Sequence, residues 1–66
     1  MPNKKEYIQV QLDLSSYGWK KIASYGAESN IVERVETWVR NGVSCLVEVL
    51  RDETATVFIE ESKMKN

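Results

Sequence analysis

Residues 30–50 read NIVERVETWVRN, then Gly42, then VSCLVEVL, and this stretch directs our interpretation of the fold. The part before Gly42 has the apolar spacing i, i+4, i+7 and i+8 of an amphipathic helix, which predicts a helix over residues 30–41. Asn30 followed by Glu33 resembles a capping box, and Gly42 suits a helix terminator. The stripe residues are Ile31, Val35, Trp38 and Val39.

The part after Gly42 predicts a strand over residues 43–50, with apolar side chains on both of its faces. A second strand is predicted over residues 54–60, joined by the three-residue loop 51–53. This loop length places Val47 opposite Val57 and Leu46 opposite Phe58, which keeps the two faces of the hairpin distinct.

The N-terminal third predicts one strand and one helix. Apolar and polar residues alternate over 6–14, which is typical of a strand with one buried face. Ser15 and Ser16 offer helix N-caps, so a short helix is predicted over residues 16–25, ending at Gly26.

We therefore expect one α+β domain over residues 1–66, with residues 1–5 and 62–66 frayed. The predicted order is β-α-α-β-β, a three-stranded antiparallel sheet with two helices packed on one face. The expected core consists of Ile8, Val10, Leu12, Ile22, Val35, Trp38, Val39, Val43, Cys45, Val47, Val49, Val57 and Ile59.

Size and composition limit what can stabilise the chain. Its 66 residues include one cysteine and no histidine, so neither an internal disulfide nor a structural zinc site is available. The net charge of −1 gives no general attraction to nucleic acid or to anionic membranes. The free thiol and the absence of an apolar leader or a membrane-spanning run lead us to expect a cytoplasmic protein.

Groups that could support catalysis have simpler interpretations. Cys45 has no histidine to activate it and lies on the predicted core face. Ser16 and Lys20 share a helical face, but an activated lysine has to be desolvated, whereas Lys20 is expected in water. Asp52 and Glu53 are adjacent acids in a turn. We predict no catalytic residue, metal ligand or cofactor site, and hence no enzyme.

The sheet face that no predicted helix covers is the best candidate for function. Apolar side chains that cluster beside unpaired strand edges can recruit another chain. We expect a small protein-interaction module, such as an inhibitor, adaptor or accessory protein of phage or plasmid type. It would bind a protein partner or itself, as a homodimer, through a sheet face or edge. The expected interface residues are Tyr7, Gln9, Gln11, Leu46, Leu50 and Phe58.

An alternative follows from a resemblance in the N-terminal half. The pattern Val10-Gln11-Leu12-Asp13-Leu14, followed by two predicted helices, resembles the ribbon-helix-helix family of DNA-binding proteins. The resemblance implies a dimer in which strand 7–13 pairs between two chains and enters the major groove. Gln9, Gln11 and Asp13 would then point toward the bases, where glutamine suits adenine.

Overall fold

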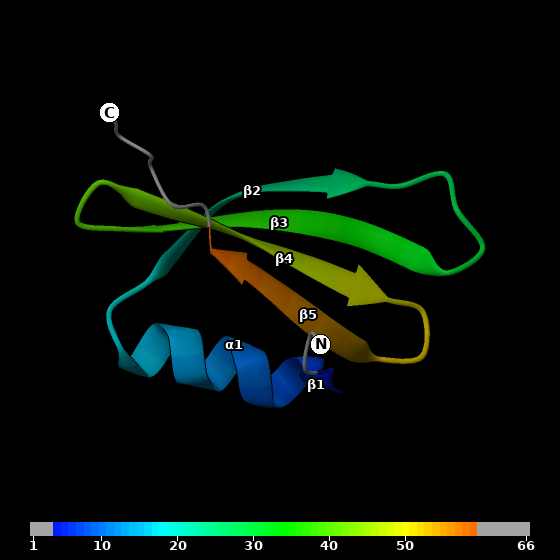
Figure 1. The fold of residues 1–66 in the computed structure, drawn as a ribbon, viewed down its shortest axis with the longest axis horizontal. Helices are drawn as coiled ribbons and strands as arrows, with labels where there is room; N and C mark the ends of the chain where they lie inside the picture. Colours follow the sequence, from blue (N-terminus) through cyan, green and yellow to red (C-terminus); the bar gives the residue numbers. More distant parts are fainter. Residues whose placement is uncertain (1–3, 60–66) are drawn as a thin grey trace.

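The computed structural model describes residues 4–59, which form five strands and one helix. The sheet is antiparallel, its strand order is β1-β5-β4-β3-β2, and α1 runs along one side of it (Figure 1). The elements are β1 (Lys5–Glu6), α1 (Tyr7–Ser16), β2 (Lys20–Gly26), β3 (Val32–Arg40), β4 (Val43–Leu50) and β5 (Thr54–Ile59).

The prediction of a strand over residues 6–14 is wrong, because Tyr7–Ser16 is α1. The alternating apolar pattern misled because a helical pattern lies within it. Tyr7, Val10 and Leu14 have the spacing i, i+3 and i+7, and these three residues pack against the sheet. Ile8 and Leu12, expected in the core, are 67% and 60% exposed on the outer side of the helix.

Gly18 ends α1. It has a φ of 92°, its N–H donates to the carbonyl of Ser15, and the N–H of Trp19 donates to the carbonyl of Leu14. These two bonds form a Schellman motif, in which a glycine takes the left-handed conformation just beyond the helix. Gly18, which falls within the helix predicted over residues 16–25, therefore ends the preceding helix instead.

The predicted helix over residues 16–25 is also wrong, because Lys20–Gly26 is strand β2. It lies at one edge of the sheet and pairs with β3 from Lys20 to Gly26, with a bulge between Lys21 and Ala23. Lysines and a bulge are common on edge strands, since both hinder pairing with a further chain.

The helix predicted over residues 30–41 is strand β3, which corrects the element on which the predicted fold depended. Asn41 and Gly42 have φ values of 52° and 80°, and Arg40 pairs with Val43 across them. Two consecutive left-handed residues form the type I′ turn of a tight hairpin, for which Asn-Gly is a preferred sequence. The segment is also rich in β-branched residues, which lose side-chain freedom in helices and pack well in sheets.

The hairpin prediction for the C-terminal third is confirmed. β4 ends at Leu50 and β5 begins at Thr54, so the connection is residues 51–53. Leu46 pairs with Phe58 and Val47 pairs with Val57, as the three-residue loop requires. Glu60, the predicted last residue of this strand, and the tail 62–66 lie outside the described residues. Lys5, for which fraying was predicted, pairs with Ala55.

In the described part of the chain, the predicted three-stranded sheet with two helices is therefore replaced by five strands and a single helix that covers one sheet face. Its core contains Val10, Trp38, Cys45, Val47, Val49 and Ala55. Of the other residues expected in the core, Ile22, Val43, Val57 and Ile59 are exposed, and Val35 and Val39 are half-buried. No helix within residues 4–59 is long and apolar enough to cross a bilayer.

Candidate functional site

The covered side of the sheet has a carboxylate at its centre. Glu36 on β3 is completely buried, and each of its carboxylate oxygens accepts at least one hydrogen bond. Oε2 accepts from the Tyr7 hydroxyl (2.7 Å) and from Arg34 Nε (3.0 Å). Oε1 accepts from Trp38 Nε1 (2.9 Å), and Lys21 Nζ lies 3.6 Å from Oε2. We call Tyr7, Lys21, Arg34, Glu36 and Trp38 the Glu36 cluster.

The Glu36 cluster joins three elements. Tyr7 is the first residue of α1, Lys21 lies on β2, and the other three residues alternate along β3 on the side that faces the helix. The Arg34 guanidinium carbon lies 4.8 Å from the centre of the Tyr7 ring, which adds a cation–π contact. A polar bridge therefore anchors the start of the helix to the middle of the sheet.

The environment keeps Glu36 ionised. Burial raises the pKa of its carboxyl, but hydrogen bonds from Tyr7, Trp38 and Arg34, together with the charge of Lys21, outweigh burial and hold the pKa below its usual value. An ionised, enclosed carboxylate whose oxygens already accept these bonds does not suit a general base. The cluster is therefore a structural feature.

Cys45 is, like Glu36, a potentially reactive group that lies inside the core. Its side chain is buried in the apolar core, and burial raises the pKa of its thiol. A protonated, enclosed thiol is a poor nucleophile. The interpretation of Cys45 as a structural core residue is confirmed.

Among residues 4–59, no helix covers the other side of the sheet, and the strand register places mainly uncharged side chains there. We call this side the open face. Leu46 and Phe58, a cross-strand pair near its centre, are 39% and 47% exposed. Glu48 and Lys20 are the charged residues that the pairing of β2 to β5 places on it. The apolar residues of this face are Ala23, Tyr25, Val35, Val39, Leu46 and Phe58.

The predicted interface residues do not form one surface. Leu46 and Phe58 lie together on the open face, whereas Leu50 is buried at the end of β4. Gln9 and Gln11 lie on α1, where the amide of Gln9 donates to Asp13 Oδ1 (2.9 Å). Tyr7 belongs to the Glu36 cluster on the covered side. Because residues 7–13 are helical, the intermolecular ribbon implied by the ribbon-helix-helix resemblance is not formed.

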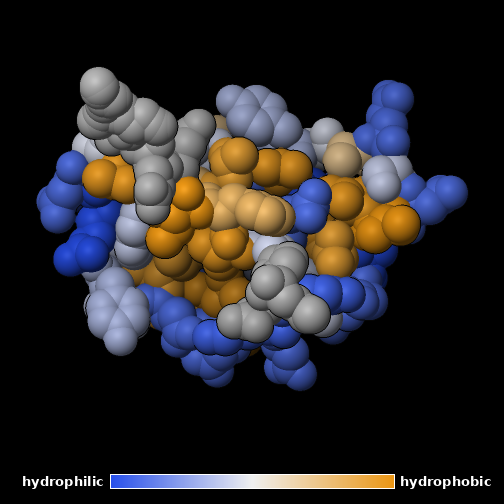
Figure 2. Space-filling model, in the orientation of Figure 1, coloured by the Kyte–Doolittle hydropathy of each residue, from blue (hydrophilic) through white to orange (hydrophobic). Residues whose placement is uncertain are grey.

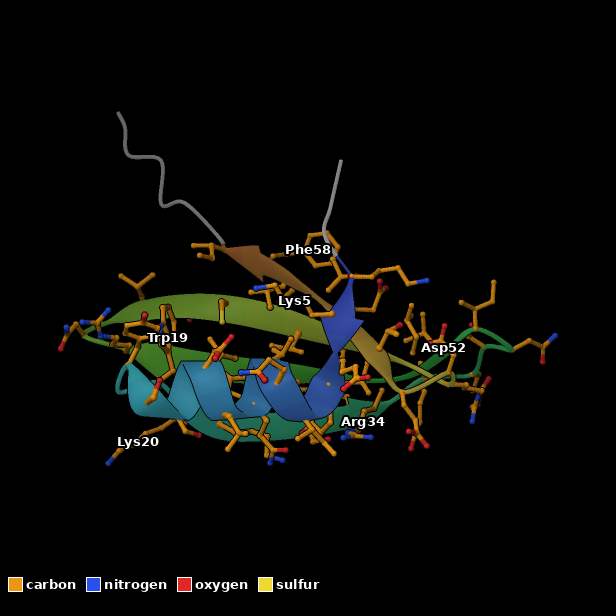
Figure 3. The ribbon with its side chains drawn as sticks, turned by 90° about the horizontal axis from the view of Figure 1, so that it is seen from below. Lys5, Trp19, Lys20, Arg34, Asp52 and Phe58 are labelled. Atoms are coloured by element: carbon orange, nitrogen blue, oxygen red, sulfur yellow. The ribbon has the colours of Figure 1, made fainter. Side chains whose placement is uncertain are left out.

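A second exposed region follows the edge of β5. Seen from the side of Figure 1, apolar side chains gather over the middle of the molecule, along β5 and in the recess between β5 and α1 (Figure 2). Val57 and Ile59 contribute to it, with 36% and 60% of their surface exposed. Seen from the helix side, Phe58 on β5 and Lys20 on β2 lie at opposite edges of the sheet (Figure 3).

Comparisons with protein families, with curated proteins and with solved structures find no match for this chain.

The residues that sequence reasoning missed are those of the Glu36 cluster. The helix predicted over residues 30–41 gives Glu36 no place in the core, whereas the structure buries it on β3. A usable signal was present, because Arg34, Glu36 and Trp38 alternate with Val35, Thr37 and Val39. Read with period two, that pattern puts charged groups and a tryptophan on one sheet face. This arrangement requires the buried charges to be paired with one another.

Proposed function

We propose that this protein is a small, non-enzymatic interaction module that binds a protein partner through its open face, centred on Leu46 and Phe58. The observation that carries the proposal is the position of this pair. Two large apolar side chains sit directly opposite each other on neighbouring strands, with no described element over them. Contiguous apolar surface of this kind is characteristic of protein–protein contact sites.

The surroundings of the pair support the same function. Thr37 of β3 lies beside Leu46, and the half-buried Val35 and Val39 flank Thr37 on the same face. The centre of the open face is uncharged, and charged groups occupy only a few positions on it. This composition resembles the core of a protein–protein interface, in which charged residues are depleted. The partner would present a matching apolar surface.

The chemistry elsewhere in the chain is consistent with a binding role. The thiol of Cys45 and the carboxylate of Glu36 are both buried in the core. The small size of the chain suits an inhibitor, adaptor or accessory protein. A free cysteine is also compatible with a reducing cytoplasm, which we propose as the location.

Site-specific photocrosslinking tests this function. A photoreactive amino acid at position 46 should form a discrete adduct with one protein in the native cells, whereas the same probe at position 8 should not. Ile8 is a matched control because it is more exposed and apolar but lies on the outer side of α1.

A pair of substitutions gives the second arm of this test. Leu46→Glu should abolish an adduct captured from a probe at position 37, because it places a charge at the centre of the contact, and Ile8→Glu should leave it unchanged. An adduct that survives Leu46→Glu in a folded protein would rule out the open face as the binding surface.

A further inference from the structure

The outer edge of β5 is paired with β1 at its start. β1 pairs Lys5 with Ala55 and Glu6 with Thr54. Within residues 4–59, no strand pairs with the same edge beyond Ala55. An unpaired strand edge is a template on which a further extended segment can form hydrogen bonds. The register of β1 indicates which segment reaches it.

The pairing of β1 with β5 fixes what lies farther along the edge. In an antiparallel pair, each step back along one strand is a step forward along the other. Because Lys5 pairs with Ala55, the same register carried back to residues 1–3 supplies one residue for each of positions 57, 58 and 59. The pairs in this register are Asn3 with Val57, Pro2 with Phe58, and Met1 with Ile59.

The hydrogen-bonding phase of the edge can be assigned. The N–H of Tyr7 donates to the carbonyl of Glu53 (2.9 Å), so this pair belongs to the hydrogen-bonded set. Hydrogen-bonded and non-hydrogen-bonded pairs alternate along antiparallel strands. Val57 and Ile59 therefore direct their N–H and C=O groups to the outer edge. In the same register, positions 3 and 1 direct theirs toward β5, and position 2 directs its groups away from it.

The proline of residues 1–3 falls at the single position of the three where a missing N–H removes no bond from the ladder. Proline is found in sheets on edge strands, where its nitrogen faces away from the neighbouring strand. Position 2 has this orientation, whereas a proline at position 1 or 3 would remove a donor to β5. Proline also favours an extended conformation in the residue before it, here Met1. The sequence is therefore in phase with the register.

We infer that residues 1–3 of this chain extend β1 along β5 and occupy its outer edge as far as Ile59. Continuity with the observed pairing of β1 and β5 favours this occupant over a separate chain. A segment that is covalently attached beside its site binds at a high effective concentration, so little freedom is lost when it pairs. The backbone groups of Val57 and Ile59 are then paired within the chain.

The side chains of Asn3 and Met1 lie on the helix side of the extended strand. Lys5 and Val57 both line a groove of about 310 Å³ between α1 and β5. Residues two apart on a strand share a face, so Asn3, opposite Val57, lies at the rim of this groove. Met1 lies opposite Ile59, which is 60% exposed, and a flexible methionine covers part of that apolar surface.

Pro2 lies on the open face, directly beside Phe58. A cross-strand row already runs there from Thr37 through Leu46 to Phe58, and Pro2 lengthens it by one residue. Its missing N–H also leaves the new outer edge without a donor at that position, so a partner meets the open face and not a strand edge. The contribution of Pro2 to binding rests on the proposed function, whereas the pairing rests on the register alone.

A swap of two neighbouring residues tests the phase of the pairing. Pro2→Asn with Asn3→Pro keeps the composition but moves the missing N–H from the outward to the inward position. Amide hydrogen exchange of Val57 and Ile59, measured by nuclear magnetic resonance, should be slow in the native protein. In the swapped variant it should be at least about fivefold faster, which corresponds to the loss of one backbone hydrogen bond.

Two controls accompany the swap. Asn3→Ala keeps the inward N–H, so the protection of Val57 and Ile59 should persist. The amide of Phe58 is directed toward β4, and its exchange should be the same in all three proteins. Circular dichroism should show that the variants are folded.

Disulfide formation within one chain tests the register. Residues in a non-hydrogen-bonded pair have Cα atoms about 4.5 Å apart, which allows a disulfide. Pro2→Cys with Phe58→Cys should form an intramolecular disulfide under mild oxidation, detected by the mass of the monomer. Asn3→Cys with Phe58→Cys should form much less, because positions 3 and 58 direct their side chains to opposite faces. The native Cys45 is buried and should not compete.

Three outcomes would overturn the inference. The first is fast exchange of the Val57 and Ile59 amides in the native protein, and the second is equal exchange in the native and swapped proteins. The third is a disulfide that forms between chains, or forms equally from positions 2 and 3. Protected edge amides together with no photocrosslinked adduct at position 46 would overturn the proposed function and leave this pairing intact.

Discussion

The two sides of this sheet handle polar and apolar groups in opposite ways. On the covered side, a carboxylate lies at the centre of the core and is held by Tyr7, Arg34 and Trp38. On the open face, leucine and phenylalanine face solvent. Burying a charge is unfavourable unless it is paired, and exposing apolar side chains forgoes the stabilisation of burial. The comparison therefore separates residues that maintain the fold from residues available for binding.

The largest effect is expected from the covered side. Trp38→Ala should destabilise the protein by about 4 kcal/mol, because it opens a cavity and removes the donor to Glu36 Oε1. A chain of this size has a free energy of unfolding of only about 3–10 kcal/mol, so much of the protein should unfold. Urea denaturation followed by far-ultraviolet circular dichroism measures this loss.

Tyr25→Ala is the matched control on the open face. It also truncates an aromatic residue, but Tyr25 is 64% exposed, so the loss should stay below about 1 kcal/mol. Equal losses for the two variants would remove the distinction between the two sides.

Glu36→Gln should cost about 3 kcal/mol at pH 7, because the uncharged amide leaves Arg34 and Lys21 without their anionic partner. Glu33→Gln removes a half-exposed carboxylate that also contacts Arg34 (3.2 Å), and its cost should be below about 1 kcal/mol. Urea midpoints of the two variants, measured together, test whether burial of the pair sets the cost.

The same carboxylate predicts an acid dependence. Since the pKa of Glu36 is lower in the folded protein than its usual value of 4.5, its ionised form stabilises the fold above that pH. This contribution should be lost as the pH falls below 4.5 and through the folded pKa. Thermal melts from pH 6 to pH 3 should show a steeper loss for the native protein than for Glu36→Gln, and parallel curves would contradict this role.

The turn between β3 and β4 should be less sensitive. Gly42→Ala should cost about 1 kcal/mol, because φ is 80° there and a side chain strains that conformation although the space around it is open. Gly26→Ala has equally open surroundings and no positive φ, so its free energy of unfolding should change by less than about 1 kcal/mol. The difference between the two melting temperatures measures the backbone strain alone.

The smallest effect is expected on the open face. Leu46→Thr should change the free energy of unfolding by less than about 0.5 kcal/mol, since position 46 is partly exposed and threonine suits a strand. The neighbouring Val47→Thr should cost about 2 kcal/mol, because it places a hydroxyl in the core. A large loss for Leu46→Thr would show that the open face maintains the fold instead of serving binding.

The elements of this chain differ in how far local sequence predicts them. The β4–β5 hairpin and its register were predictable, because the connection length and the pattern of the two faces agree on a single pairing. The structure of residues 30–41 was not predictable, because their apolar residues fit a helical spacing and a strand spacing at the same time. The Asn41-Gly42 turn and the β-branched residues resolve that ambiguity in favour of a strand.

The candidate surfaces show the same division. The pairing of Leu46 with Phe58 followed from the hairpin register alone. The position of Tyr7 did not, because residues 6–14 carry both a period-two and a helical pattern. Strands β2 to β5 take up the rest of the described sequence after α1, which leaves this segment as the helix that covers the sheet. The pairing of β1 with β5 was likewise not predictable, because it is a contact between distant parts of the chain.

The sequence by itself determined the C-terminal hairpin, the burial of Trp38 and Cys45, and the outward position of Leu46 and Phe58. These features depend on short-range spacing and on turn geometry, which neighbouring residues specify. The tertiary structure decided which segment became the helix, how the charge of Glu36 was neutralised, and where β1 pairs with β5. Those outcomes depend on packing between distant segments, because a buried carboxylate is stable only where α1, β2 and β3 bring its donors together.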